Sequence, residues 1–158
     1  MKMSFRWYGE SDPISLEYIR QIPNMRSIVS AVYDVKPGEV WPEESIAKMK
    51  KQCEDNNLIF DIVESIPVHE NIKLGRDNVD ELLEVYCENI RRCAKYGVKC
   101  VTYNFMPVFD WTRTELARKR EDGSTVLAYT QEAVDALDPE KMFDSIAGDM
   151  NGTVMPGW

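Results

Sequence analysis

The sequence KCVTYNFMPVFDWTR, residues 99–113, decides the fold of this chain. Most residues from Cys100 to Phe105 are apolar, β-branched or aromatic, and these types favour a covered β-strand. Pro107 ends the strand, because proline has no amide hydrogen and restricts the residue before it. The six residues that follow, 108–113, include two aromatics, an acid and a base. A strand followed by such a loop indicates an α/β protein with ligand contacts at this point. The alternative is that the aromatic residues only cover the sheet.

The rest of the chain alternates apolar runs, which predict strands, with periodic apolar faces, which predict helices. Asn78 followed by Glu81 predicts a capping box at the start of the last of these helices. After Arg113 the pattern weakens and predicts only a short strand at 125–129 and a helix within 135–147. The predicted strands are 3–8, 27–34, 58–65 and 99–106, and the predicted helices are 15–22, 41–56 and 79–94.

This alternation predicts an α/β fold in which helices cover parallel strands. The pattern alone does not separate a doubly wound sheet from part of a (β/α)8 barrel. No glycine-rich phosphate-binding motif follows any of the predicted strands. Chemically active side chains do gather where the predicted strands end, which is where barrel enzymes carry their sites.

The composition excludes some classes of protein. The 158 residues carry a net charge of −8, whereas a protein that binds nucleic acid needs a basic surface. No apolar run approaches the roughly 20 residues of a membrane span, and the first residues lack an apolar signal segment. We therefore expect a cytoplasmic protein without nucleic-acid or membrane partners. The four cysteines show no CxxC spacing, which predicts free thiols.

Four segments carry a resemblance to a known family. FRWYG at 5–9, AVYDV at 31–35, ESIPVHE at 64–70 and YNFMPVFDWTR at 103–113 resemble mannonate dehydratases in sequence and in order. The resemblance covers the whole chain but only about the first half of the family's sequence. It implies the amino-terminal half of a (β/α)8 TIM barrel. Residues 1–113 would then form the first four βα units, and residues 114–158 an irregular insertion that leads to the missing second half.

The resemblance also implies an activity, which is the removal of water from D-mannonate to give 2-keto-3-deoxy-D-gluconate in hexuronate breakdown. Members of the family use Mn²⁺ or Fe²⁺, bound by histidine, cysteine and acidic side chains of the later barrel strands. Those positions lie beyond Trp158, and the single histidine of this chain cannot form such a centre. We therefore assign no metal ligand and no proton-transfer residue, and we expect the isolated chain to be inactive.

The remaining candidates are contacts to the sugar acid. Strand alternation places Arg6 and Tyr8 on the face opposite Phe5 and Trp7, towards the barrel interior. Arg6 is a candidate for pairing with the substrate carboxylate, although it alternatively neutralises a neighbouring acid such as Glu64. Glu64 itself is a candidate to orient a substrate hydroxyl or a metal ligand.

The other candidates follow the later strands. Asn104 is a candidate to bind a substrate hydroxyl or, alternatively, the loop backbone. His69 is either a contact of the site or a structural histidine. Trp111 and Arg113 are candidates to line the sugar pocket, and their alternative is to cap the barrel mouth.

Two further hypotheses come from other classes of protein. The chain could belong to another metal-dependent barrel family, such as a sugar isomerase or epimerase. It could instead be a non-catalytic half-barrel that forms a homo-oligomer, because an open sheet would expose two edge strands.

Overall fold

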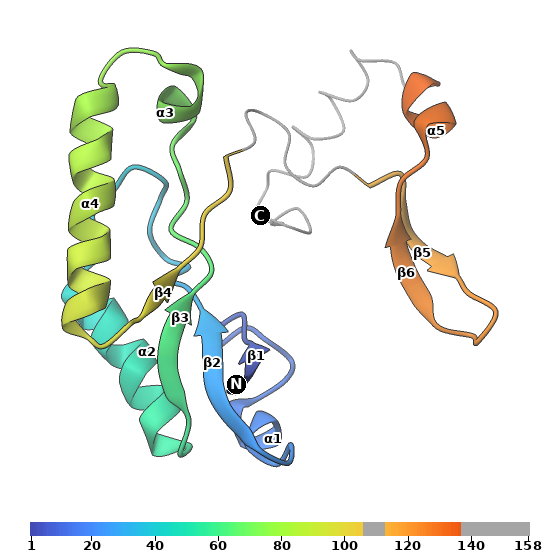
Figure 1. Ribbon diagram of the computed structural model, residues 1–158, viewed down its shortest axis with the longest axis horizontal. Helices are drawn as coiled ribbons and strands as arrows, with labels where there is room; N and C mark the ends of the chain where they lie inside the picture. Colours follow the sequence, from blue (N-terminus) through green and yellow to red (C-terminus); the bar gives the residue numbers. More distant parts are fainter. Residues whose placement is uncertain (106–112, 137–158) are drawn as a thin grey trace. The chain divides into compact units, whose positions relative to one another are not determined.

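The computed structural model describes residues 1–105 and 113–136 (Figure 1). The chain divides into two compact units, Met1–Pro107 and Val108–Trp158. The first unit contains a four-stranded sheet with helices, and the second contains a two-stranded sheet. The boundaries predicted from the sequence for the barrel segment and the insertion, 1–113 and 114–158, stay predictions.

The sheet of the first unit is parallel, with the strand order β1-β2-β3-β4. A doubly wound sheet reverses its strand order at one point, whereas a barrel adds each strand next to the previous one. The sequential order therefore fits a partial barrel, and the predicted α/β class is confirmed. Its strands are β1 (Met3–Arg6), β2 (Met25–Ser30), β3 (Ile59–Val63) and β4 (Cys100–Val101).

The strands end earlier than predicted, because the residues after them leave the ladder to form loops. Single backbone hydrogen bonds continue one position beyond β1, β3 and β4, from Trp7 to Val29, from Glu64 to Ser30 and from Thr102 to Val63. Then the loops begin.

The prediction of a covered strand was wrong both in β4, where Cys100 is exposed, and in the described residues after it. Tyr103 is 64% exposed and Phe105 is 52% exposed. Among the residues that the structure describes, β4 pairs only with β3, so nothing shields its outer side. The apolar residues that predicted a covered strand therefore lie at the open β4 edge of the sheet.

The three predicted helices are present as α1 (Leu16–Ile19), α2 (Glu43–Asp55) and α4 (Val79–Lys95). The predicted capping box is wrong. Asn78 has a left-handed backbone (φ 60°), and its side chain accepts a hydrogen bond from Asn71 instead of capping the helix. A further short helix, α3 (Glu70–Leu74), lies where the sequence predicted neither a strand nor a helix. Five residues are too few to show a periodic apolar face.

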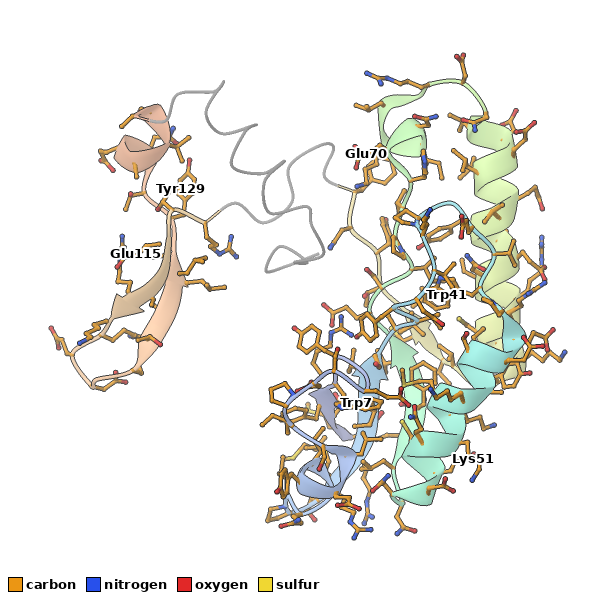
Figure 2. All side chains as sticks on the ribbon, turned by 180° about the vertical axis from the view of Figure 1, so that it is seen from behind. Trp7, Trp41, Lys51, Glu70, Glu115 and Tyr129 are labelled. Atoms are coloured by element: carbon orange, nitrogen blue, oxygen red, sulfur yellow. The ribbon has the colours of Figure 1, made fainter. Side chains whose placement is uncertain are left out.

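The core lies between the sheet and its helices. Ile28, Phe60 and Val63 of the strands are at most 4% exposed, and Ile46 of α2 is fully buried. Trp41 precedes α2 and is also buried (Figure 2). The other buried apolar side chains of this core include Trp7, Leu16, Ile19, Met25, Met49, Cys53, Leu58, Ile66, Cys93 and Val98.

All four cysteines are free, as the sequence predicted. Burial raises the pKa of the Cys53 thiol to about 12 and that of the Cys93 thiol to about 11. Both thiols therefore stay protonated at neutral pH, and a protonated thiol is a poor nucleophile and metal ligand.

The second unit contains an antiparallel pair, β5 (Glu115–Lys119) and β6 (Thr125–Ala128), followed by α5 (Gln131–Asp135). β6 agrees with the strand predicted at 125–129, whereas the charged sequence of β5 gave no strand signal. Most of the helix predicted within 135–147 lies outside the described residues.

Candidate functional site

Four side chains meet at the carboxyl ends of β1, β2 and β3. We call Arg6, Tyr8, Tyr33 and Glu64 the rim cluster. Arg6 lies at its centre and donates a hydrogen bond from Nη1 to the Tyr33 hydroxyl at 2.9 Å. Its Nε lies 3.8 Å from a carboxylate oxygen of Glu64. Its guanidinium carbon lies 4.7 Å from the centre of the Tyr8 ring and 5.9 Å from that of Tyr33.

Tyr33 is fixed from several sides. Its hydroxyl donates to the backbone carbonyl of Trp7 at 3.1 Å, and Ser30 donates to the same carbonyl at 2.7 Å. The Tyr33 ring lies against Gly9, where an added Cβ would come within 3.0 Å of the ring. Gly9 also has φ +84°, a conformation that a side chain would strain. The backbone that follows β1 therefore packs closely against the Tyr33 ring, and a side chain at position 9 would disturb this contact.

The structure brings together three of the predicted site residues, Arg6, Tyr8 and Glu64. The alternative considered for Arg6, a pairing with Glu64, is present as a long ion pair. Tyr8 is 56% exposed and the Glu64 side chain is 55% exposed, so solvent reaches the cluster. An ion pair at this distance between partly exposed groups is weak.

His69 has a local structural task. It is the N-cap of α3, and its Nδ1 accepts a hydrogen bond from the backbone of Asn71 at 3.1 Å. The ring also packs where a Cβ on Gly38 would come within 2.9 Å of it. Among the contacts described for His69, none joins it to the rim cluster. Its predicted role as a substrate contact stays a prediction.

The structure does not test the other three predicted site residues. Asn104 lies after β4 and is partly buried. Arg113 belongs to the second unit, and Trp111 lies outside the described residues. The predicted roles of these three side chains stay predictions.

Sequence reasoning missed Tyr33 as a site residue. The signal was available, because Tyr33 belongs to the AVYDV segment and lies near the end of a predicted strand. Neighbouring Asp34 is the charged residue of that segment, and both side chains are exposed in the structure. The pairing of Tyr33 with Arg6 joins residues 27 positions apart, and only the parallel pairing of β1 and β2 brings them together.

A second polar cluster lies within the sheet. Asp61 of β3 is buried, accepts a hydrogen bond from the Ser27 hydroxyl and pairs with Lys2 at 2.5 Å. Burial by itself would raise the pKa of the Asp61 carboxyl. The bonds from Lys2 and Ser27, with the charges of Lys2 and Lys99, outweigh burial and lower this pKa below its ordinary value. Asp61 therefore stays ionised and ties β3 to Ser27 of β2 and to Lys2, the residue before β1.

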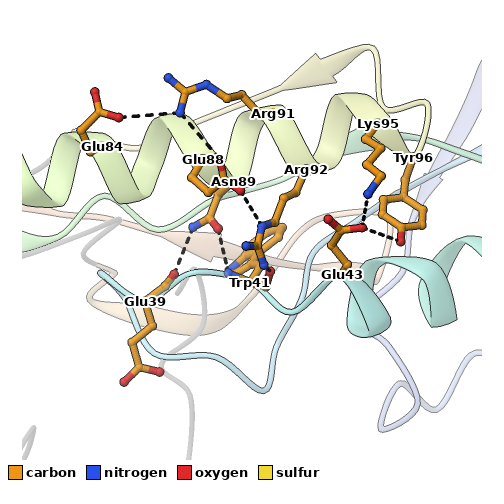
Figure 3. A network of polar contacts seen from close by, with 10 residues as sticks. All are labelled: Glu39, Trp41, Glu43, Glu84, Glu88, Asn89, Arg91, Arg92, Lys95 and Tyr96. Carbon is orange, nitrogen blue, oxygen red and sulfur yellow. Dashed lines mark hydrogen bonds and ion pairs between the residues drawn. The ribbon is translucent and has the colours of Figure 1, made fainter.

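A third network fastens the segment before α2 to α4 (Figure 3). Asn89 accepts a hydrogen bond from the Trp41 amide at 2.7 Å and donates one to the Glu39 carbonyl at 3.1 Å. Arg92 donates to the Trp41 carbonyl at 2.9 Å and pairs with Glu88. These contacts position the helix layer.

Within residues 1–105 and 113–136, no group of three or more histidine, cysteine, aspartate or glutamate side chains could hold a metal ion. No helix in that part of the chain is long and apolar enough to cross a membrane. The rim cluster is instead suited to an anion. Its guanidinium presents planar donors for a carboxylate, while the tyrosines and Glu64 supply hydroxyl and carboxylate groups.

Comparisons with known proteins agree on one family. The family model described as D-mannonate dehydratase (UxuA) matches residues 1–158. Curated mannonate dehydratases from Geobacillus thermodenitrificans and Streptococcus uberis are each 49% identical to the chain. Each match covers 100% of this chain and 43% of the relative.

A solved structure gives the same result for the fold. The crystal structure of mannonate dehydratase from Streptococcus suis serotype 2 matches with a TM-score of 0.85 and 47% sequence identity. The match covers 98% of this chain and 45% of that one. The chain thus spans less than half the length of the relatives it matches, as the resemblance in its sequence implied.

Proposed function

Because this chain belongs to the mannonate dehydratase family, we propose that its rim cluster binds the carboxylate end of D-mannonate in a dehydratase of this kind. One observation carries the proposal. The Arg6 guanidinium is held at the carboxyl end of β1 by a tyrosine and lies beside a half-exposed acid that it pairs with only at 3.8 Å. Barrel enzymes bind their substrates at this end of the strands.

The chemistry explains why a fixed cation is useful there. Dehydration of a sugar acid removes the proton from the carbon beside the carboxylate and expels the neighbouring hydroxyl. Negative charge then spreads onto the carboxylate oxygens. Paired donors from one guanidinium hold both oxygens and stabilise that charge. The proposed product is 2-keto-3-deoxy-D-gluconate.

The proposal assigns different roles to the metal ion and to the described residues. A divalent ion, Mn²⁺ or Fe²⁺, supplies charge stabilisation at the substrate oxygens when it is bound. The described residues do not fit a metal site, and we assign them no ligand. Arg6, Tyr8 and Glu64 bind and orient the substrate, and none of the described residues is proposed to move a proton. We place the activity in the cytoplasm.

The test compares two chains in an assay for 2-keto-3-deoxygluconate formed from D-mannonate with manganese. One is the 158-residue chain, and the other continues residues 1–158 to the full length of the relatives. We expect turnover only by the longer chain. In that chain, Arg6→Lys keeps the charge but loses the fork of donors, and we expect KM to rise roughly tenfold. Lys51→Arg, an exposed change on α2, serves as the control. Turnover by the short chain, or an unchanged KM for Arg6→Lys, would contradict the proposal.

A second candidate function is a non-catalytic half-barrel that pairs with another copy of itself. The observation that favours it is the open edge of β4 beside the exposed Tyr103 and Phe105. Under this alternative the longer chain would form no 2-keto-3-deoxygluconate.

A further inference from the structure

Tyr33 is the tyrosine that holds Arg6 in the site proposed above, and its hydroxyl makes the shortest side-chain contact to the guanidinium that the structure describes. We propose that Tyr33 is a positioning residue, which sets the direction of the Arg6 guanidinium so that its remaining donors face the substrate carboxylate. This inference rests on the proposed function, because it concerns the same carboxylate site.

The first support is the hydrogen-bond pattern. Arg6 Nη1 donates to the Tyr33 hydroxyl at 2.9 Å, and that hydroxyl donates its own hydrogen to the Trp7 carbonyl at 3.1 Å. A guanidinium can only donate, so the Tyr33 oxygen accepts from Arg6 while its own hydrogen goes to the Trp7 carbonyl. This contact uses one guanidinium N–H group and leaves others for a ligand.

The second support is the set of contacts around Tyr33, which is itself 48% exposed. Ser30 is fully buried and donates to the same Trp7 carbonyl at 2.7 Å. Gly9 leaves only enough room for the Tyr33 ring and holds a backbone conformation that favours glycine. Tyr33 thus joins the end of β1 to the segment after β2. A long arginine side chain anchored to it loses less freedom when a substrate binds.

The third support is the contrast with Glu64. Its contact with Arg6 is longer, at 3.8 Å, and its side chain is 55% exposed. Tyr33 therefore determines where the guanidinium points, whereas Glu64 shares the position that a substrate carboxylate would take.

The first experiment measures Arg6 in the 158-residue chain. NMR relaxation of the Arg6 Nε–H group reports the mobility of the guanidinium. We expect Tyr33→Phe, which removes only the hydroxyl, to raise the mobility of Arg6 to that of exposed Arg20. Tyr18→Phe removes the hydroxyl of an exposed α1 tyrosine outside the rim cluster and is the matched control. An Arg6 signal that stays rigid in Tyr33→Phe would overturn the positioning role, whatever the function of the protein.

The second experiment measures kinetics in the chain continued to the length of the relatives. We expect Tyr33→Phe to raise the KM for D-mannonate roughly fivefold to tenfold, while kcat changes less than twofold. If Arg6 becomes mobile but KM stays the same, Arg6 does not bind the substrate carboxylate. That result would overturn the proposal that Tyr33 orients Arg6 for substrate binding. If the unsubstituted chain forms no product, the proposed function fails while the NMR result still decides the positioning role.

Discussion

At the scale of single residues, His69 combines a capping bond with a packing contact. Its Nδ1 accepts the Asn71 amide, and its ring lies against Gly38. Helix caps of this kind act locally, because they satisfy one of the amide groups that a helix start leaves without a partner.

We predict that His69→Ala exposes the Asn71 amide and lowers the free energy of unfolding by about 1 kcal/mol. Hydrogen exchange of the Asn71 amide measures the first effect, and urea unfolding measures the second. His69→Asn offers a new capping oxygen and should restore the protection of Asn71, although the ring packing is lost. Unchanged exchange at Asn71 in His69→Ala would rule out the capping role.

Asp61 shows how a buried carboxylate makes stability depend on pH. Its pKa is lowered in the folded protein, whereas in the unfolded chain it returns to about 3.9. The stability it contributes is therefore complete above that value and is lost as the pH falls towards and through the folded-state pKa.

We predict that Asp61→Asn lowers the free energy of unfolding by about 1–3 kcal/mol at pH 7, because Lys2 loses its charged partner. Urea unfolding at a series of pH values should show the difference from the unsubstituted chain shrinking below about pH 4. Asp34→Asn, a change at an exposed acid, is the control. A difference that stays constant down to pH 2 would contradict the role assigned to the Asp61 charge.

At the scale of elements, α4 is fastened to the chain before α2 by one buried amide. Asn89 is 3% exposed and satisfies both the Trp41 amide and the Glu39 carbonyl (Figure 3). The amide side chain bridges two backbone groups that otherwise would lack partners in an apolar setting.

We predict that Asn89→Ala lowers the free energy of unfolding by about 1–3 kcal/mol, since it leaves the buried Trp41 amide without its acceptor. Leu83→Ala on the same helix removes an exposed side chain and should cost much less. Chemical denaturation followed by tryptophan fluorescence measures both variants. Equal losses for the two would mean that the hydrogen bonds of Asn89 contribute nothing specific.

At the scale of the whole molecule, the sheet of the first unit remains open within the described residues. β1 pairs only with β2 and β4 pairs only with β3. Met3 and Ile59, on β1 and β3, are each 48% exposed. Open strand edges beside exposed apolar residues favour association with another chain.

We predict that the 158-residue chain self-associates as its concentration rises, and that Met3→Lys, on the edge strand β1, weakens this association. The lysine places a charge on the exposed part of the sheet without removing a backbone hydrogen bond. Leu83→Lys adds the same charge on α4 and is the control. Sedimentation velocity at several concentrations measures the change, and a chain that stays monomeric throughout would contradict the prediction.

Much of this organisation was predictable from the sequence. The apolar runs and periodic faces predicted the four parallel strands and the helices α1, α2 and α4, because burial imposes a period of 2 or 3.6 on the sequence. The four family-like segments predicted the family and its partial coverage, which the comparisons confirm. Arg6, Tyr8 and Glu64 were predicted because each stands near the end of a predicted strand.

Only the tertiary structure decided what those residues contact. Tyr33 reaches Arg6 because β1 and β2 pair in parallel. The sequence around either residue does not predict this contact. The exposure of Tyr103 and Phe105 depends on the absence of a described neighbour beside β4, which no local pattern encodes. A sequence determines which face of an element is apolar, since that is local. The neighbours that meet that face depend on strand pairing across the whole sheet.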